Sequence, residues 1–274
     1  MTSMRVAVCQ MRSGADVQAN LETASGLVIE AADGGADLAA LPEYLEYMGP
    51  AAGRSGVATP VPGATTDRLA IVARERRVWV LAGGVLEAEG GRVHDTSVLI
   101  DRDGEIAASY RKIHLYDVDL PDQPPIRESA TITAGSELVT HQTEAARIGL
   151  SICYDVRFPE LYRGLMALGA EVLTVPAQFQ FATGKDHWHT LLRARAIENQ
   201  CFVVAPGQWG GYGEPGEGRR SFGHSLVVDP WGRILVEAPE EGTGVWFADL
   251  DLSELRQLRR SFPVLQHRRL GSVC

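Results

Sequence analysis

The sequence predicts an α/β fold in which two packed β-sheets are covered by helices. Apolar runs of strand length alternate with helical segments early in the chain, which is typical of layered α/β proteins. Hairpins are interspersed among them, and this favours two mixed sheets over one purely parallel, doubly wound sheet. The 274 residues show no internal repeat, low-complexity tract or linker. We therefore expect a single domain over residues 1–274.

The first half of the chain supplies alternating strands and helices. Gly34-Gly35 ends the first helix, and Gly90-Gly91 and Asp103-Gly104 are typical of hairpin turns. Residues 114–136 are rich in Pro, Asp and Glu and have no period, so we predict a long ordered loop, which in a compact domain is usually functional. The predicted strands cover 5–11, 37–41, 78–86, 96–101 and 106–112, and the predicted helices cover 20–32 and 65–76.

The second half repeats this alternation and ends in antiparallel strands. A predicted strand runs into Cys153, and the tail over 254–274 is rich in arginine. In an acidic chain this tail indicates a packing arm or a subunit contact rather than a nucleic-acid patch. The remaining predicted helices cover 159–168 and 186–199, and the remaining strands cover 171–176, 201–206, 223–229, 233–237 and 245–249.

Composition excludes several classes of partner. The formal net charge is -9, which argues against nucleic acid or an anionic membrane surface as the main partner. No apolar run is long enough to span a bilayer, and the first residues lack the apolar stretch of a signal peptide. The 4 cysteines are far apart and form no C-x-x-C motif, so a reducing compartment is expected. We expect a cytoplasmic protein.

Cys153 is the residue whose position says most about chemistry. An apolar run ends at this cysteine, and Pro159-Glu160 opens a helix a few residues later. Amide N–H groups and the positive end of a helix dipole at such a position favour a thiolate, which is a nucleophile. A single buried cysteine is equally compatible with an inert hydrophobic residue. Position alone leaves both interpretations open.

Glu43 and Lys112 also follow the ends of predicted strands. Strand ends of a layered sheet meet at one edge, so three such side chains can form one site. Cys153 would attack a carbonyl, Glu43 would take the thiol proton, and Lys112 with the backbone N–H of Tyr154 would hold the oxyanion. Water activated by Glu43 would then cleave the thioester. A glutamate or lysine taken alone is most often a solvated surface group.

Three segments around these residues resemble the signature blocks of the nitrilase superfamily of carbon–nitrogen hydrolases: 41–44, 110–117 and 149–160. Segments 184–188, 191–200, 223–225, 227–232 and 263–269 resemble its Nit branch, which contains deaminated glutathione amidases and omega-amidases. The resemblance implies an α-β-β-α sandwich, a Glu43–Lys112–Cys153 triad, homodimers or larger assemblies, and no cofactor. It also implies that Glu128 orients Lys112, although a loop carboxylate would otherwise be assigned to the surface.

Four further residues are candidates for substrate binding: Arg157, Gln178, Thr183 and His187. Arg157 can bind a substrate carboxylate bidentately or brace the turn after Cys153. Gln178 stands where the resembling proteins usually have a small residue, and His189 where they often have glutamate. His187 and His189 are two residues apart and point to different faces of a helix, so no metal site is expected.

The expected function is a thiol-dependent amidase that cleaves the amide of a small carboxylated substrate through a cysteine thioester and releases ammonia. Deaminated glutathione and short omega-amides such as 2-oxoglutaramate are the candidate substrates. The alternatives are an N-carbamoyl amine hydrolase or a nitrilase with the same triad, and a catalytically silent scaffold. A Cys–His hydrolase is a further alternative, and it would need His114 or His187 beside Cys153.

Overall fold

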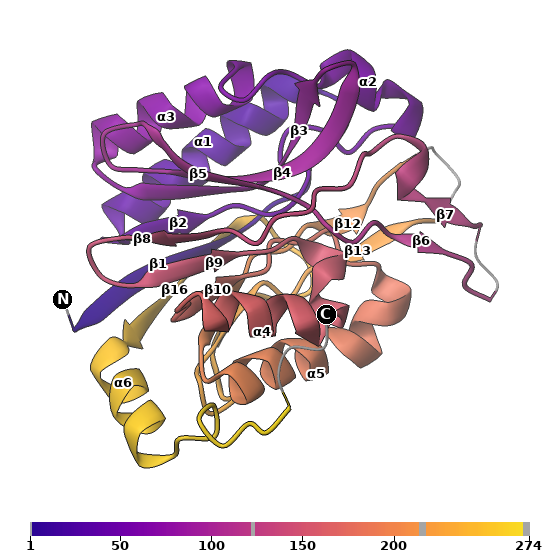
Figure 1. Cartoon of the computed structure of the whole chain (residues 1–274). Helices are drawn as coiled ribbons and strands as arrows, with labels where there is room; N and C mark the ends of the chain where they lie inside the picture. Colours follow the sequence, from indigo (N-terminus) through magenta and orange to yellow (C-terminus); the bar gives the residue numbers. More distant parts are fainter. Residues whose placement is uncertain (1, 122–123, 214–217, 271–274) are drawn as a thin grey trace.

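A computed structural model describes residues 2–121, 124–213 and 218–270, and Figure 1 shows their arrangement in four layers. Two six-stranded sheets face each other at the centre. Helices α1 (Val17–Asp33) and α3 (Ala64–Arg76) cover the outer face of the first sheet. Helices α4 (Pro159–Ala167) and α5 (Phe181–Asn199) cover the outer face of the second. The predicted α-β-β-α sandwich is confirmed.

The first sheet has the order β16-β1-β2-β3-β4-β5. Its three central strands are parallel, and the outer strands are antiparallel to their neighbours. Alternate residues of the first strand point to opposite faces, so Val6 and Val8 enter the core between the sheets while Ala7 and Cys9 pack toward the helices. The strands are β1 (Ser3–Gln10), β2 (Leu38–Ala40), β3 (Trp79–Glu89), β4 (Arg92–Ile100), β5 (Ile106–Arg111) and β16 (Gly244–Asp251).

The second sheet has the order β15-β14-β11-β10-β9-β8, again with three parallel strands inside. Burial on both faces explains why its central strands are mostly apolar, with Arg147 and Thr174 as the exceptions at the strand ends. Its strands are β8 (Thr140–Gln142), β9 (Arg147–Leu150), β10 (Val172–Thr174), β11 (Phe202–Ala205), β14 (Leu226–Val228) and β15 (Ile234–Glu237).

Short elements on the connections were only partly predicted. The long loop over 114–136 contains a two-stranded pair and a 3-10 helix, and residues 51–57 are helical although no period marks them. The additional elements are 3-10 helices η1 (Ala51–Gly53), η2 (Glu128–Ala130) and η3 (Cys153–Arg157), helix α2 (Arg54–Val57), and strands β6 (Asp117–Val118), β7 (Ile126–Arg127), β12 (Trp209–Gly211) and β13 (Arg220–Phe222).

Helix α5 begins at Phe181, five residues before the predicted start at residue 186, so Thr183 is helical. Gly184 weakens the helical pattern in the sequence because glycine is a poor helix former. In the structure, a Cβ at Gly184 would lie 2.4 Å from Cγ of Phe222, so the glycine allows the helix to pack closely on β13. Tertiary packing therefore overrides the local preference.

The helix of the C-terminal segment packs on its own chain, whereas residues 266–270 are exposed. Helix α6 (Leu252–Ser261) places Arg256 against Glu171 at 2.8 Å, and Arg259 donates to the carbonyl of Ala170 at 2.8 Å. Residues 271–274 of the predicted arm over 254–274 lie outside the described residues. A contact of this arm with another subunit, and the single domain over 1–274, stay predictions.

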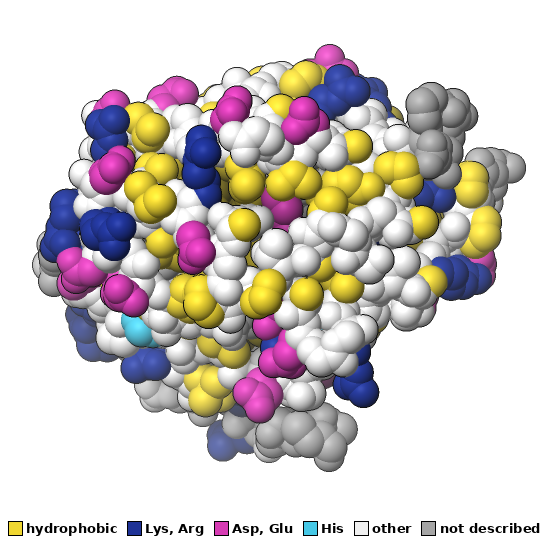
Figure 2. Space-filling model, turned by 90° about the horizontal axis from the view of Figure 1, so that it is seen from above, with side chains coloured by type: hydrophobic (Ala, Val, Ile, Leu, Met, Phe, Trp, Pro, Cys, Tyr) yellow, Lys and Arg dark blue, Asp and Glu magenta, His cyan; other side chains and the backbone are white. Residues whose placement is uncertain are grey.

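The surface shows no segregation of charge on the face drawn in Figure 2, where basic and acidic side chains are interspersed among hydrophobic ones. No helix in the described part of the chain has both the length and the apolar character needed to cross a membrane.

Gly83 and Gly84 allow the segments beyond the strands to approach one another. Both lie at an irregularity of β3, where the register with β4 shifts between Ala82 and Val85. A Cβ at Gly83 would lie 2.0 Å from the carbonyl oxygen of Leu41 and 2.4 Å from Cβ of Pro176. These contacts join the end of β2 in one sheet to the end of β10 in the other, so the glycine sets how closely the two strand ends meet.

Gly83→Ala is expected to destabilise the fold by about 1–3 kcal/mol, because the added methyl group must displace the backbone at Leu41 on one side and the ring of Pro176 on the other. Chemical denaturation measures this free energy of unfolding. Gly26→Ala is the matched control, since a Cβ there meets no atom within 4 Å inside helix α1. It is expected to stabilise by about 0.5–1 kcal/mol. Equal effects of the two substitutions would contradict this account of Gly83.

Candidate active site

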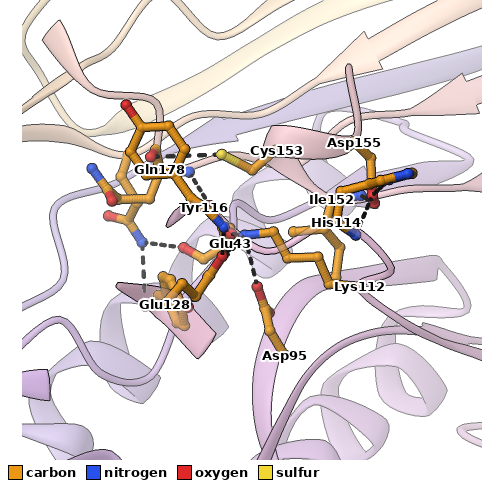
Figure 3. Close-up of polar contacts among 12 residues, drawn as sticks. Glu43, Asp95, Lys112, His114, Tyr116, Glu128, Ile152, Cys153, Asp155 and Gln178 are labelled. Atoms are coloured by element: carbon orange, nitrogen blue, oxygen red, sulfur yellow. Dashed lines mark hydrogen bonds and ion pairs between the residues drawn. The ribbon is translucent and has the colours of Figure 1, made fainter. Parts of the chain in front are cut away.

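Three strand ends meet in one buried cluster, which Figure 3 shows. Glu43 lies beyond β2, Lys112 directly follows β5, and Cys153 follows β9 of the other sheet. The Nζ of Lys112 donates a hydrogen bond of 2.7 Å to Oε1 of Glu43. The exposed fractions are only 1% for Glu43, 2% for Lys112 and 8% for Cys153. The structure thus brings together the three residues that the sequence placed at strand ends.

Lys112 is held by several carboxyl groups. Its Nζ donates to both carboxylate oxygens of Glu128 at 2.9 Å and lies 3.6 Å from Oδ2 of Asp95. Burial acts to lower the pKa of Lys112, but the charges of Glu128 and Glu43 outweigh it and raise that pKa well above its ordinary value. The lysine is therefore a fixed positive charge inside the protein.

Glu128 accepts hydrogen bonds from more than the lysine. The Tyr44 hydroxyl donates to its Oε1 at 2.5 Å, and the backbone N–H of Tyr116 donates to its Oε2 at 2.6 Å. Burial opposes ionisation of Glu128, yet Lys112 and these donors lower its pKa below the ordinary value. A carboxylate satisfied by so many donors is ionised, and it fixes the direction of the lysine side chain.

Cys153 occupies an unusual backbone conformation at the start of η3. Its φ is 45°, in the left-handed region that non-glycine residues rarely adopt. The backbone N–H of Cys153 donates to the carbonyl of Pro176 at 2.9 Å, which fixes this sharp turn to the end of β10. The Sγ lies 3.7 Å from the carbonyl oxygen of Gln178. The turn therefore aims the thiol at the residues that follow β10.

The expectation that the position of Cys153 favours a thiolate is wrong for the resting protein. Burial, and then the negative charge of Glu43, raise the pKa of the Cys153 thiol well above its ordinary value, and Lys112 only partly offsets them. The thiol therefore keeps its proton and needs a base. Glu43 is oriented for that task because the backbone N–H of Gln178 donates to its Oε2 at 2.5 Å.

The two histidines considered as a base for Cys153 both contact other residues. The Nδ1 of His114 lies 2.7 Å from Oδ1 of Asp155, and its ring stacks on Phe158. The Nδ1 of His187 lies 3.1 Å from Nη1 of Arg157. Neither ring is directed at Cys153, so the arrangement does not support a Cys–His hydrolase.

A cavity of about 230 Å³ opens in front of Cys153. The guanidinium carbon of Arg157 lies 5.2 Å from the ring centre of Phe179 and 5.7 Å from that of Tyr154. Gln178 and Thr183 line the cavity, whereas His187 lies behind Arg157 and reaches it only through that residue. The aromatic lining residues are Tyr44, Tyr116, Tyr154, Phe179 and Tyr212, and the cationic ones are Arg54, Lys112, Arg127, Arg157 and Arg219.

Sequence reasoning missed three residues of this cluster: Tyr44, Asp95 and Tyr116. Tyr44 directly follows Glu43 and has a φ of 54°, which turns its ring back toward Glu128. Asp95 lies inside β4, one residue before the predicted strand, and a carboxyl group in an otherwise buried strand was a usable signal. Tyr116 contributes a backbone donor, which residue type does not reveal.

Two groups in the described part of the chain bring three potential metal ligands together. The first is Glu43, Asp95 and Glu128, and the ammonium of Lys112 lies within 3.6 Å of each. The second is His189, His224 and Glu237, in which the glutamate oxygen is bound by both rings. In the first group, the lysine supplies the positive charge that a metal ion would otherwise bring.

Comparison with known proteins agrees with this geometry. The carbon-nitrogen hydrolase family model matches residues 5–260. The chain is 43% identical to a deaminated glutathione amidase from Synechocystis sp., over 96% of this chain and 97% of that protein. It superposes with a TM-score of 0.91 on the Caenorhabditis elegans NitFhit protein, at 37% identity over 98% of this chain and 66% of that one.

A third relative bears on the cysteine. A mutant of the amidase from Nesterenkonia sp. AN1 shows covalent addition of the acetamide moiety of fluoroacetamide at its active-site cysteine. It is 28% identical, with a TM-score of 0.79, over 97% of each chain. The fold, the buried cluster and the family match all lead to one conclusion: the chain belongs to the carbon–nitrogen hydrolase family.

Proposed function

We propose that the protein is a thiol-dependent amidase whose triad is Glu43, Lys112 and Cys153. The observation that carries the proposal is that the buried carboxylate of Glu43, bound to the buried ammonium of Lys112 at 2.7 Å, lines the same cavity as the thiol of Cys153. This arrangement supplies a nucleophile, a base and a fixed positive charge in one water-poor site. Burying these charges destabilises the fold, and a catalytically silent scaffold would gain nothing in return.

Acylation begins when Glu43 takes the thiol proton of Cys153. The sulfur attacks the amide carbon, and the carbonyl electrons move to oxygen as the tetrahedral intermediate forms. Lys112 and the backbone N–H of Tyr154 stabilise that oxyanion. The C–N bond then breaks, the leaving nitrogen takes the proton from Glu43, and an acyl thioester remains on Cys153.

Deacylation repeats the sequence with water. Glu43 takes a proton from a water molecule as the water oxygen attacks the thioester carbon. Lys112 and the backbone N–H of Tyr154 stabilise the second oxyanion. The C–S bond breaks, the thiolate of Cys153 recovers a proton from Glu43, and a carboxylic acid leaves. Glu128 stays ionised throughout and positions Lys112, to which it is bound at 2.9 Å.

The substrate is a small amide that carries a carboxylate. Arg157 lies on the cavity wall and suits a bidentate carboxylate contact, with His187 behind it. Thr183 adds a hydroxyl, and Gln178 narrows the cavity beside the sulfur. Deaminated glutathione fits this description, in agreement with the names of the relatives, and so does an omega-amide such as 2-oxoglutaramate.

The nitrogen product depends on the substrate. A primary omega-amide releases ammonia, whereas deaminated glutathione carries its amide nitrogen in a peptide unit and releases an amine. The expectation of ammonia therefore holds for only one of the two candidate substrates. We also propose a cytoplasmic homodimer or larger homo-oligomer, because the described cysteines Cys9, Cys153 and Cys201 are free thiols and the arginine-rich C-terminal segment offers a contact surface.

A substrate panel tests the reaction. Deaminated glutathione, omega-amides, carbamoyl amines and nitriles are incubated with the protein, and ammonia, amine and acid products are measured. Amide cleavage by the wild type is expected, with loss of all turnover in Cys153→Ala because the thioester cannot form. Preferred cleavage of a nitrile or a carbamoyl amine would replace the proposed substrate class. Turnover that survives in Cys153→Ala would exclude the thiol mechanism.

Glu43→Gln tests the base. Glutamine keeps the size of the side chain but cannot accept the thiol proton, so kcat is expected to fall by about 10²–10⁴-fold. Glu46→Gln is the matched control, because Glu46 is equally buried but bonds the backbone N–H of Leu86 and does not line the cavity. Burial raises the pKa of Glu46 to about 7, so a neutral side chain is already tolerated there. Similar losses in both variants would contradict the assignment.

Arg157→Met tests recognition of the carboxylate. The variant is expected to raise KM for a carboxylated amide by at least about tenfold, since a charge-assisted pair is lost. An uncharged short amide serves as the control substrate, and its KM should change little. If both substrates lose equally, Arg157 braces the turn after Cys153 instead.

A further inference from the structure

The active-site cluster holds more carboxyl groups than its single ammonium can balance. Glu43, Asp95 and Glu128 place their oxygens within 4.8 Å of one another around Lys112. All three are at least nine-tenths buried, and Asp95 has an exposed fraction of 0%. Several ionised carboxylates in so small a dry volume are unfavourable unless each is compensated. The hydrogen bonds show which group is not compensated.

The donors are distributed unequally. Glu128 accepts from Lys112, the Tyr44 hydroxyl and the Tyr116 backbone, and Glu43 accepts from Lys112 and the Gln178 backbone. Neither carboxyl oxygen of Asp95 has a hydrogen-bond donor in the described part of the chain. Its nearest cation, Nζ of Lys112, lies 3.6 Å away and is already bound to the two glutamates. A buried carboxyl group without donors is more stable with a proton than without one.

We propose that Asp95 is a positioning residue that stays protonated and donates a hydrogen bond to Glu43. This inference rests on the function proposed above, in which Glu43 is the ionised base. The proton of Asp95 gives Glu43 a third donor on the side away from Gln178. Figure 3 shows Asp95 reaching the cluster from β4, next to the lysine ammonium.

The surrounding charges agree with this assignment. Burial, and next the charge of Glu43, raise the pKa of Asp95 well above its ordinary value, and Lys112 opposes them. A neutral Asp95 leaves the cluster with one net negative charge instead of two, so a thiolate forms against less repulsion. The titratable or charged groups that act on Asp95 or are affected by it are Glu43, Tyr44, Arg54, Lys112 and Glu128.

The pH dependence of stability tests the protonation state without any assay of activity. A carboxyl group whose pKa is raised on folding removes stability as pH rises above its unfolded value, whereas asparagine does not titrate. The midpoint of denaturation of Asp95→Asn, measured against wild type, is therefore expected to rise steadily from about pH 4 to pH 8. A relative midpoint that falls over this range means an ionised Asp95 paired with Lys112 and overturns the proposal.

Asp155→Asn is the matched control for this measurement. Asp155 is also buried, but it accepts from the backbone N–H groups of Ile152 and His114 and from the Tyr110 hydroxyl, and Nδ1 of His114 lies 2.7 Å from its Oδ1. In Asp155→Asn the side-chain NH₂ group would face these N–H and O–H donors and could not accept from them. The variant is therefore expected to be less stable than wild type throughout the pH range. The contrast separates a buried aspartate without donors from one whose oxygens accept several hydrogen bonds, within the same fold.

Rescue of turnover tests the positioning role. Asp95→Asn keeps a donor toward Glu43 and is expected to lower kcat by no more than about threefold. Asp95→Ala removes the donor and is expected to lower kcat by at least about tenfold with little change in KM. Equal loss in both variants overturns the positioning role. If the wild type cleaves no amide, the proposed function fails, while the stability measurement still decides the state of Asp95.

Discussion

The ammonium of Lys112 is the interaction on which the rest of the site depends. It is buried, and within the described residues its ion pairs are with the carboxyl groups around it. Those groups must therefore be delivered by several segments at once: the turn after β2, the strand β4 and the 3-10 helix η2. A buried charge that solvent screens poorly gives a strong and fixed electric field in the cavity that Lys112 shares with Cys153.

The two sheets contribute different parts of the chemistry. Glu43 and Lys112 come from the first sheet, while Cys153 and Gln178 follow strands of the second. The contact between the Gln178 backbone and Glu43 crosses from one to the other. Glycine at position 83 is what allows these strand ends to meet, because any side chain would occupy the place of the Leu41 carbonyl. The absence of a side chain at Gly83 is thus required for the contact between Gln178 and Glu43.

Much of the architecture follows from local pattern. The helical spacing of α1 and α3, the hairpin glycines and the apolar central strands lead directly to two sheets covered by helices, and the strand ends lead to Glu43, Lys112 and Cys153. The local pattern does not reveal which residues distant in sequence come into contact. The backbone donors of Tyr116 and Gln178 have no side-chain signature, and the start of α5 depends on how Gly184 meets Phe222. The protonation state of Cys153 likewise comes from burial and from a carboxylate distant in sequence.

The bond between the Gln178 backbone and Glu43 has a consequence for partly unfolded forms. A state that keeps both sheets but loosens the core between them separates Glu43 from Cys153, although the backbone hydrogen bonds within each sheet survive. Enzymatic activity is therefore expected to depend on the packing of the two sheets against each other rather than on the amount of secondary structure. The hydrogen bond between Gln178 and Glu43 forms only when the two sheets lie at their native distance.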